Sequence, residues 1–147
     1  MNLREAIVHG KATGDFSACV AQIAYLQFMG ISMEVVAGEL LGHMAYSERI
    51  VGNARADALH GGTLGALMEA TAVFTVLAQE APVIKVPKTI GITVDYLRSA
   101  GRRDTWARAL FTRQGRRVAS VRILCWQQDR DKPVAAANAH FLLSPMS

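Results

Sequence analysis

One run of residues constrains the fold more than any other part of the chain. Residues 61–79, GGTLGALMEATAVFTVLAQ, carry a single charge, Glu69, and are apolar on nearly every side of a helix. Such a helix is normally buried, and at ~1.5 Å per residue it is about 28 Å long. One neighbouring helix cannot cover it on all sides, whereas a curved antiparallel sheet can. The run therefore predicts an α+β fold in which a sheet wraps around one central helix.

The part of the chain before this helix predicts one more helix and two strands. Residues 16–29 have the pattern of a peripheral helix ended by a glycine, after an N-terminal segment over residues 1–15. Residues 31–46 contain two internal glycines, which favours two strands joined at a turn over a helix. Residues 47–60 are polar and irregular, and they predict a loop.

The part of the chain after the central helix predicts four more strands. Their β-rich or alternating patterns run over residues 89–97, 105–112, 117–126 and 133–143. Together with the two earlier strands, these give a sheet of about five to six strands. No linker interrupts the 147 residues, so a single domain over 1–147 is expected.

Composition argues against several classes of protein. With 51% hydrophobic residues, the chain has enough apolar surface to fold rather than stay disordered. Its cysteines, Cys19 and Cys125, match no metal spacing, which predicts no metal site and a reduced, cytoplasmic protein. His9, His43 and His140 also lack metal-ligand spacing and are expected to be structural or exposed. No apolar run near the N-terminus is long enough to span a bilayer, so no membrane partner is expected.

The net charge of +4 reflects an excess of arginines late in the chain. A solvated strand face and a surface that attracts an anionic ligand both explain them. Nucleic acid is one such ligand, but no aromatic stacking motif accompanies the arginines, and a phosphate-bearing small molecule fits at least as well. The arginines are Arg98, Arg102, Arg103, Arg108, Arg113, Arg116, Arg117 and Arg122.

The start of the central helix offers backbone donors to a ligand. Gly61 and Gly62 expose N–H groups at the positive end of a helix dipole, and without side chains they let a ligand oxygen approach. This is the chemistry of an oxyanion hole. The alternative is that the two glycines only permit a sharp turn from loop to helix.

Glu69 is the second candidate in the same helix. The residues three and four positions away are Gly65, Ala66, Ala72 and Val73, which offer neither an ion pair nor a solvated stripe. Burying a carboxylate without a partner is costly. Either the carboxylate escapes into a crevice or a subunit boundary, or it is a nucleophile or general base in an apolar cleft.

The spacing of these two candidates predicts an assembly. Gly61 and Glu69 are eight residues apart, which is about 12 Å along one helix, so they cannot both touch the same carbonyl. They could do so if two copies of the helix lay antiparallel in a dimer, with Glu69 of one copy facing Gly61 of the other. A two-fold axis would then create two such sites.

Two segments of the chain resemble one family of enzymes. The segment HGGTLGALMEA, in which Glu69 follows His60 by nine residues, resembles hot-dog-fold acyl-CoA thioesterases of the phenylacetic-acid-degradation type and the 4-hydroxybenzoyl-CoA thioesterase group. The later segment TIGITVDYLRSA is similar to the family's third strand and the turn after it. The resemblance covers about residues 30–143 and implies a hot-dog fold, in which a sheet wraps around a central helix.

The resemblance also implies roles for individual residues. Gly61 would supply the oxyanion N–H and Glu69 would be the nucleophile or general base. His60 would support the thioester carbonyl or the loop, and Thr89 would help to position water. The substrate-binding residues would be Asn53, Gly62, Arg98, Arg102 and Arg103, with the arginines holding the phosphates of CoA.

One position departs from the family pattern. Many members carry Asn or Gln six residues before the histidine, where this chain has Ala54, and Asn53 lies one residue earlier. A shifted loop could restore the amide, but its role in this chain is open.

The implied activity is hydrolysis of an acyl-CoA thioester to a carboxylic acid and free CoA. No cofactor is expected beyond CoA as part of the substrate, and the expected assembly is a homodimer or a dimer of dimers with sites at the subunit interface. A non-catalytic hot-dog module that binds acyl-CoA as a sensor or carrier is the alternative. A hot-dog hydratase fits less well, because no Asp/His pair stands at the usual close spacing.

Overall fold

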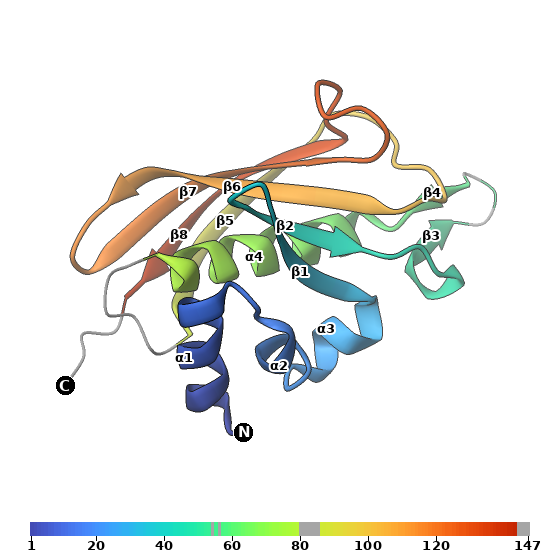
Figure 1. The fold of residues 1–147 in the computed structure, drawn as a ribbon. Coiled ribbons are helices and arrows are strands. Elements are labelled where there is room, and N and C mark those ends of the chain that lie inside the picture. The colour runs from blue at the N-terminus through green and yellow to red at the C-terminus, as the bar shows by residue number, and fades with distance from the viewer. Residues whose placement is uncertain (54, 56, 80–85, 144–147) are drawn as a thin grey trace.

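A sheet wrapped around one long helix forms the fold (Figure 1). The computed structural model describes residues 1–53, 55, 57–79 and 86–143. The helix is α4 (Gly61–Ala78), and the strands of the main sheet run antiparallel in the order β1-β2-β6-β7-β8-β5. Their bounds are β1 (Ile31–Val36), β2 (Glu39–Met44), β5 (Lys88–Tyr96), β6 (Thr105–Gln114), β7 (Val118–Trp126) and β8 (Ala135–Leu142). The α+β architecture and the central helix expected from the sequence are confirmed.

Helix α4 packs into the sheet at very short range. A Cβ atom added to Gly42 of β2 would lie 1.9 Å from the Oγ1 atom of Thr71, so only glycine lets the two elements approach this closely. Thr71 is fully buried and donates its hydroxyl to the Leu67 carbonyl at 2.7 Å, which makes it a packing residue. Although α4 is long and apolar enough to span a bilayer, half of it is buried inside the fold.

The N-terminal region differs from the prediction. The sequence predicts no helix in the N-terminal segment over residues 1–15, where the structure has α1 (Leu3–Thr13). The Asn2 side chain accepts from the Glu5 N–H at 2.8 Å, which caps the start of α1, and it donates to the Glu5 carboxylate at 2.9 Å. Gly10 of α1 lies against the ring of Phe16, and that ring meets Phe74 of α4 edge-on, 5.6 Å between centroids.

The single peripheral helix expected over residues 16–29 is wrong. The segment forms two short helices, α2 (Ser17–Val20) and α3 (Ala24–Met29). Ile23 separates them in an extended conformation, with φ −106° and ψ 97°, and its N–H bonds back to the Val20 carbonyl. Cys19 and Val20 of α2 and Leu26 and Met29 of α3 are buried, so both short helices pack against the core.

Two connections shape the region before α4. Ala37 and Gly38 join β1 to β2 with φ values of 52° and 80°, the twist of a tight hairpin turn, so the expected pair of strands is confirmed. The loop expected over residues 47–60 contains more structure than predicted. It forms a 3-10 turn, η1 (Glu48–Ile50), and a small hairpin of β3 (Val51–Asn53) and β4 (Ala58–Leu59).

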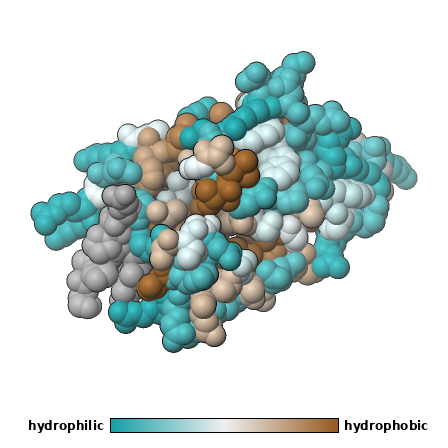
Figure 2. All heavy atoms as spheres, viewed as in Figure 1, coloured by the Kyte–Doolittle hydropathy of each residue, from teal (hydrophilic) through white to brown (hydrophobic). Residues whose placement is uncertain are grey.

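Side chains alternate between two faces of the main sheet, here called the inner face, toward α4, and the outer face. In β7, Val121 and Ile123 are buried on the inner face, whereas Arg122 is exposed on the outer face. The four α-helices of the described residues all lie on the inner side, and none of them covers the outer face (Figure 1). Figure 2 shows apolar residues reaching the surface near the middle of one side view, between hydrophilic ends.

Candidate functional site

The start of α4 leaves one backbone donor free. His60 is the N-cap residue, and its Nδ1 atom accepts from the Gly62 N–H at 3.0 Å. The hydroxyl of Thr63 donates to the His60 carbonyl at 2.6 Å, which fixes the first turn. Among the described residues, the Gly61 N–H has no hydrogen-bond partner. Of the two glycine donors predicted for an oxyanion, Gly62 is therefore occupied and Gly61 is available.

The same contact sets the tautomer of His60. Because Nδ1 accepts a hydrogen bond, the neutral ring carries its proton on Nε2. His60 is exposed, so this second nitrogen is a donor on the surface beside Gly61. The arrangement allows His60 to support a carbonyl oxygen, as the sequence predicts, while it also caps the helix.

Tyr96 is a site residue that the sequence prediction missed. Its hydroxyl donates to the Gly61 carbonyl at 3.0 Å. A Cβ atom added to Gly61 would lie 3.1 Å from the Tyr96 ring, which is tighter than ordinary contact. Its signal was in the strand pattern, because Tyr96 continues the alternation of Ile92 and Val94 on the inner face. Tyr96 thus holds the first turn of α4 and favours glycine at position 61.

Glu69 lies on the least covered side of α4. Gly62, Gly65, Ala66, Glu69 and Val73 follow one another at helical spacing and are half-buried or exposed; together they are called the open stripe. A Cβ atom added to Gly65 would meet no atom within 4 Å, so the space beside Glu69 is open in the single chain. Within the described chain, the Glu69 carboxylate makes neither a hydrogen bond nor an ion pair.

The predicted reacting groups lie apart within one chain. α4 is a regular helix from Gly61 to Ala78, so Glu69 lies about 12 Å from Gly61 along its axis. Thr89 pairs with the buried Phe141 and faces the inner side. It is near the start of β5, whereas Tyr96 at its end holds Gly61, a separation of about 23 Å along the strand. One chain alone therefore does not bring Gly61 together with Glu69 and Thr89.

The arginines expected to hold CoA phosphates have different surroundings. Arg102 bonds to Glu48 at 3.2 Å and to Asp57, so two carboxylates neutralise its charge. Arg98 and Arg103 are exposed and make no ion pair with any described residue. These two are free to meet an anion, while Arg102 serves first to tie the segment before α4 to the loop before β6.

The amide expected near the site is only partly described. The backbone of Asn53 belongs to β3 and pairs with Ala58. The Asn53 side chain and all of Ala54 lie outside the described residues.

Of the histidines that the sequence predicts to be structural or exposed, His43 makes structural contacts and His9 faces solvent. His43 stacks on Trp106, with ring centroids 4.1 Å apart, and its Nε2 atom lies 2.8 Å from Asp104. Asp104 also accepts the Tyr46 N–H at 2.8 Å, and these two contacts hold the pKa of its carboxyl below its ordinary value. His9 is exposed on α1. Across the described residues, no three His, Cys, Asp or Glu side chains gather as a metal site would require.

Comparisons with known proteins identify the fold and the family. The model of the thioesterase superfamily matches residues 57–134, more than half of the chain. A Chromobacterium violaceum protein of known structure is 34% identical, with 97% of this chain and 99% of that chain covered and a TM-score of 0.75. No curated protein sequence matches the chain.

Two more distant structures agree in fold. The PaaI protein of the E. coli phenylacetic acid degradation operon is 17% identical, with 99% of each chain covered and a TM-score of 0.75. A Bacillus halodurans protein solved with CoA is 16% identical, with 99% of this chain and 93% of that chain covered and a TM-score of 0.76. The match over α4 and most of the sheet, together with the Chromobacterium relative, shows that this chain belongs to the thioesterase superfamily.

Proposed function

We propose that this protein is an acyl-CoA thioesterase in which Glu69 and the oxyanion donor Gly61 come from different subunits of a homodimer. The observation that carries the proposal is the unpaired, half-buried Glu69 carboxylate on the open stripe. A carboxylate in that position stabilises nothing within the described chain, and therefore a reaction is the better reason for its presence.

The open stripe supports the dimer. Its residues around Glu69 are glycine, alanine and valine, so a second helix can approach closely. If a second α4 lies antiparallel on the stripe, Gly61 of the partner subunit moves toward Glu69. In each subunit, Gly61 lies at the Tyr96 end of β5. The same two-fold operation therefore brings that end of the partner's β5 toward the Thr89 end of this subunit's β5. Both separations that prevent a site within one chain are thereby removed, and two equal sites result.

The chemistry requires only these groups and water. The Glu69 carboxylate either attacks the thioester carbonyl, giving a mixed anhydride that water cleaves, or takes a proton from attacking water. The oxyanion that forms accepts the Gly61 N–H, helped by the positive end of the helix dipole. The C–S bond then breaks. Water supplies the hydroxyl of the carboxylic acid, and the thiolate of CoA leaves and takes up a proton.

CoA as the thiol part of the substrate is supported by charge and by fold. Arg98 and Arg103 are exposed cations without ion-pair partners in the described chain. The Bacillus halodurans structure of the same fold was solved with CoA. The proposal leaves the acyl group unassigned, and a hydrolysis screen over short, long and aromatic acyl-CoAs would identify it.

The decisive experiment replaces Glu69 by glutamine, which keeps the size of the side chain and removes its charge. We expect kcat for thiol release to fall at least ~10²-fold, the lower range for lost acid–base catalysis. The melting temperature should stay the same or rise, because the substitution removes an unpaired charge from the apolar open stripe. Glu34→Gln is the matched control, since Glu34 is exposed on β1 without a partner in the described chain.

Three results would contradict the proposal. Near-normal turnover by Glu69→Gln would remove the residue from the reaction. A wild-type protein that binds acyl-CoA and releases no thiol would instead be the non-catalytic module. A monodisperse, active monomer by light scattering would exclude a shared site.

A further inference from the structure

The outer face of the sheet carries a cavity that the proposed reaction does not use. It has a volume of about 620 Å³ and lies beside the hairpin that joins β6 to β7. Its polar lining consists of Arg113, Arg116, Arg117, Ser120 and His140, and none of its lining residues is a carboxylate. The cavity therefore gathers three permanent positive charges at one end of the sheet.

The strand register aligns part of this lining in a single row. Arg113 of β6 pairs with Ser120 of β7, and Ser120 pairs with His140 of β8. Paired residues of neighbouring strands point to the same face, so the three side chains stand side by side on the outer face. Gly91 of β5 comes next in the row, and a Cβ atom there would meet no atom within 4 Å. The row thus ends in open space rather than in a covering side chain.

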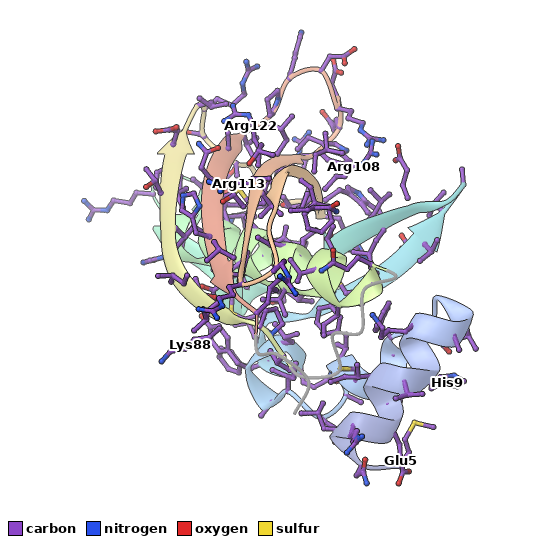
Figure 3. The ribbon with its side chains drawn as sticks, turned by 90° about the vertical axis from the view of Figure 1, so that its left-hand side faces the viewer. Glu5, His9, Lys88, Arg108, Arg113 and Arg122 are labelled. Atoms are coloured by element: carbon purple, nitrogen blue, oxygen red, sulfur yellow. The ribbon has the colours of Figure 1, made fainter. Side chains whose placement is uncertain are left out.

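Two β-bulges flank the row and determine which residues join it. The register of β6 against β7 shifts between Phe111 and Arg113, and that of β5 against β8 shifts between Thr89 and Gly91. Without the first shift, Arg113 would point to the inner face, toward the core. Bulges re-aim side chains and are common beside functional sites. Figure 3 shows Arg113 over the strands of the sheet, on the same side as Arg122.

The arginines of the cavity differ from others on the chain. Arg102, Arg108 and Arg130 each form an ion pair with a glutamate or an aspartate. The three cavity arginines pair with no carboxylate among the residues that the structure describes. Like charges that line one cavity repel one another, and a bound anion offsets the repulsion. The planar fork of each guanidinium also matches the oxygens of a phosphate.

Ser120 and His140 add a neutral donor to the cavity. The Ser120 Oγ atom lies 2.7 Å from the His140 Nδ1 atom. If the serine donates, the ring keeps its proton on Nε2, and if Nδ1 donates, the serine hydroxyl keeps its proton free. Either tautomer leaves the pair with one unused proton to offer a ligand.

We propose that this cavity is a binding site for a phosphomonoester-bearing anion of nucleotide size. Three guanidiniums match the charge of a phosphorylated ligand, and the volume exceeds what one phosphate fills and falls in the range of small-molecule sites. Such a phosphomonoester can come from the nucleotide end of CoA or from a free nucleotide, and inorganic phosphate serves only as a probe of the anion subsite. The first source rests on the proposed function, whereas binding itself does not.

Calorimetric titration of the purified protein at low salt tests the site. The probes are adenosine 3′,5′-bisphosphate, inorganic phosphate, CoA and dephospho-CoA, which lacks the 3′-phosphate. We expect Arg116→Ala and Arg117→Ala each to weaken binding of the bisphosphate about tenfold. Arg122→Ala removes the same charge from the same face outside the cavity and is the matched control. All three side chains are exposed, and melting curves will verify that the variants fold.

These measurements distinguish CoA from a separate phosphorylated ligand, and they test the cavity independently of the thioesterase proposal. CoA that binds more tightly than dephospho-CoA, with a raised KM and unchanged kcat in Arg117→Ala, would assign the site to the substrate. Binding of the bisphosphate or of phosphate with KM unchanged would assign it to a separate ligand. A Kd weaker than about 1 mM for every probe, or an equal loss in Arg122→Ala, would overturn the site. The titrations need no turnover, so failure of the thioesterase proposal would leave this test intact.

Discussion

Replacing Gly42 by alanine tests how closely α4 is held against the sheet, and therefore how its reactive groups are positioned. The added Cβ atom would lie 1.9 Å from the Thr71 Oγ1 atom and 3.2 Å from the Leu67 Cδ1 atom. The hydroxyl must move by more than 1 Å to reach ordinary contact. Because it donates to the Leu67 carbonyl at 2.7 Å, turning it away also breaks that hydrogen bond.

The two effects give a measurable loss of stability. Overpacking a core costs about 1–3 kcal/mol, and the lost hydrogen bond costs about 1 kcal/mol. A total of about 3 kcal/mol corresponds to a Tm lower by about 9 °C in a domain of this size. Gly91→Ala is the control, because a Cβ atom there meets nothing within 4 Å, and its Tm should not fall.

A double-mutant cycle separates this contact from a general effect of alanine. Thr71→Ala removes the clashing oxygen, so Gly42→Ala/Thr71→Ala should be at least as stable as Gly42→Ala alone. Thermal melting at one fixed protein concentration measures all four proteins, because oligomers change Tm with concentration. A neutral Gly42→Ala, or penalties that simply add in the double variant, would refute the close contact.

Three further predictions concern single side chains. Lys11 donates to two carbonyls at the end of α4, at 2.7 and 2.6 Å, so Lys11→Met should lower stability by about 1.5–3 kcal/mol in melting experiments. Burial raises the pKa of Cys125 to about 12, so a thiol reagent at neutral pH should label it only after unfolding. The pKa of Asp104 is lowered in the folded state, so its contribution is present at neutral pH and lost as the pH falls through that pKa. The stability gap to Asp104→Asn should therefore narrow as the pH falls below the ordinary range of an aspartate, as measured by urea unfolding at a series of acidic pH values.

Much of the fold was predictable because its strongest patterns are local. A run with one charge in nineteen residues favours a buried central helix, and the alternation in β5 and β7 identifies strands with two different faces. The peripheral helices were harder. Asn2 and Glu5 carry a capping signal for α1, whereas residues 20–23 contain neither glycine nor proline to announce the break at Ile23.

The site was predictable to a smaller extent. The absence of an ion-pair partner for Glu69 within the described chain follows from its neighbours in the helix, and the structure agrees with that expectation. The alternation in β5 places Tyr96 on the inner face, but its contact with Gly61 joins residues 35 positions apart, and no local pattern identifies that partner. The pairing of Arg102 with Glu48 and Asp57 is likewise a long-range contact. Of the three arginines expected to hold CoA, it leaves Arg98 and Arg103 without an ion pair among the described residues.

The bulge at Thr112 makes the β6–β7 hairpin sensitive to the parity of insertions and deletions. Side chains alternate along a strand with a period of two, so deleting the one extra residue would turn Arg113 from the outer face to the core. A two-residue insertion or deletion would leave each side chain on its present face of the sheet and would change only the length of the hairpin. Homologues that retain an arginine at the position of Arg113 should therefore differ from this chain by even numbers of residues between Phe111 and that arginine, and odd differences there should accompany an apolar residue at the same position.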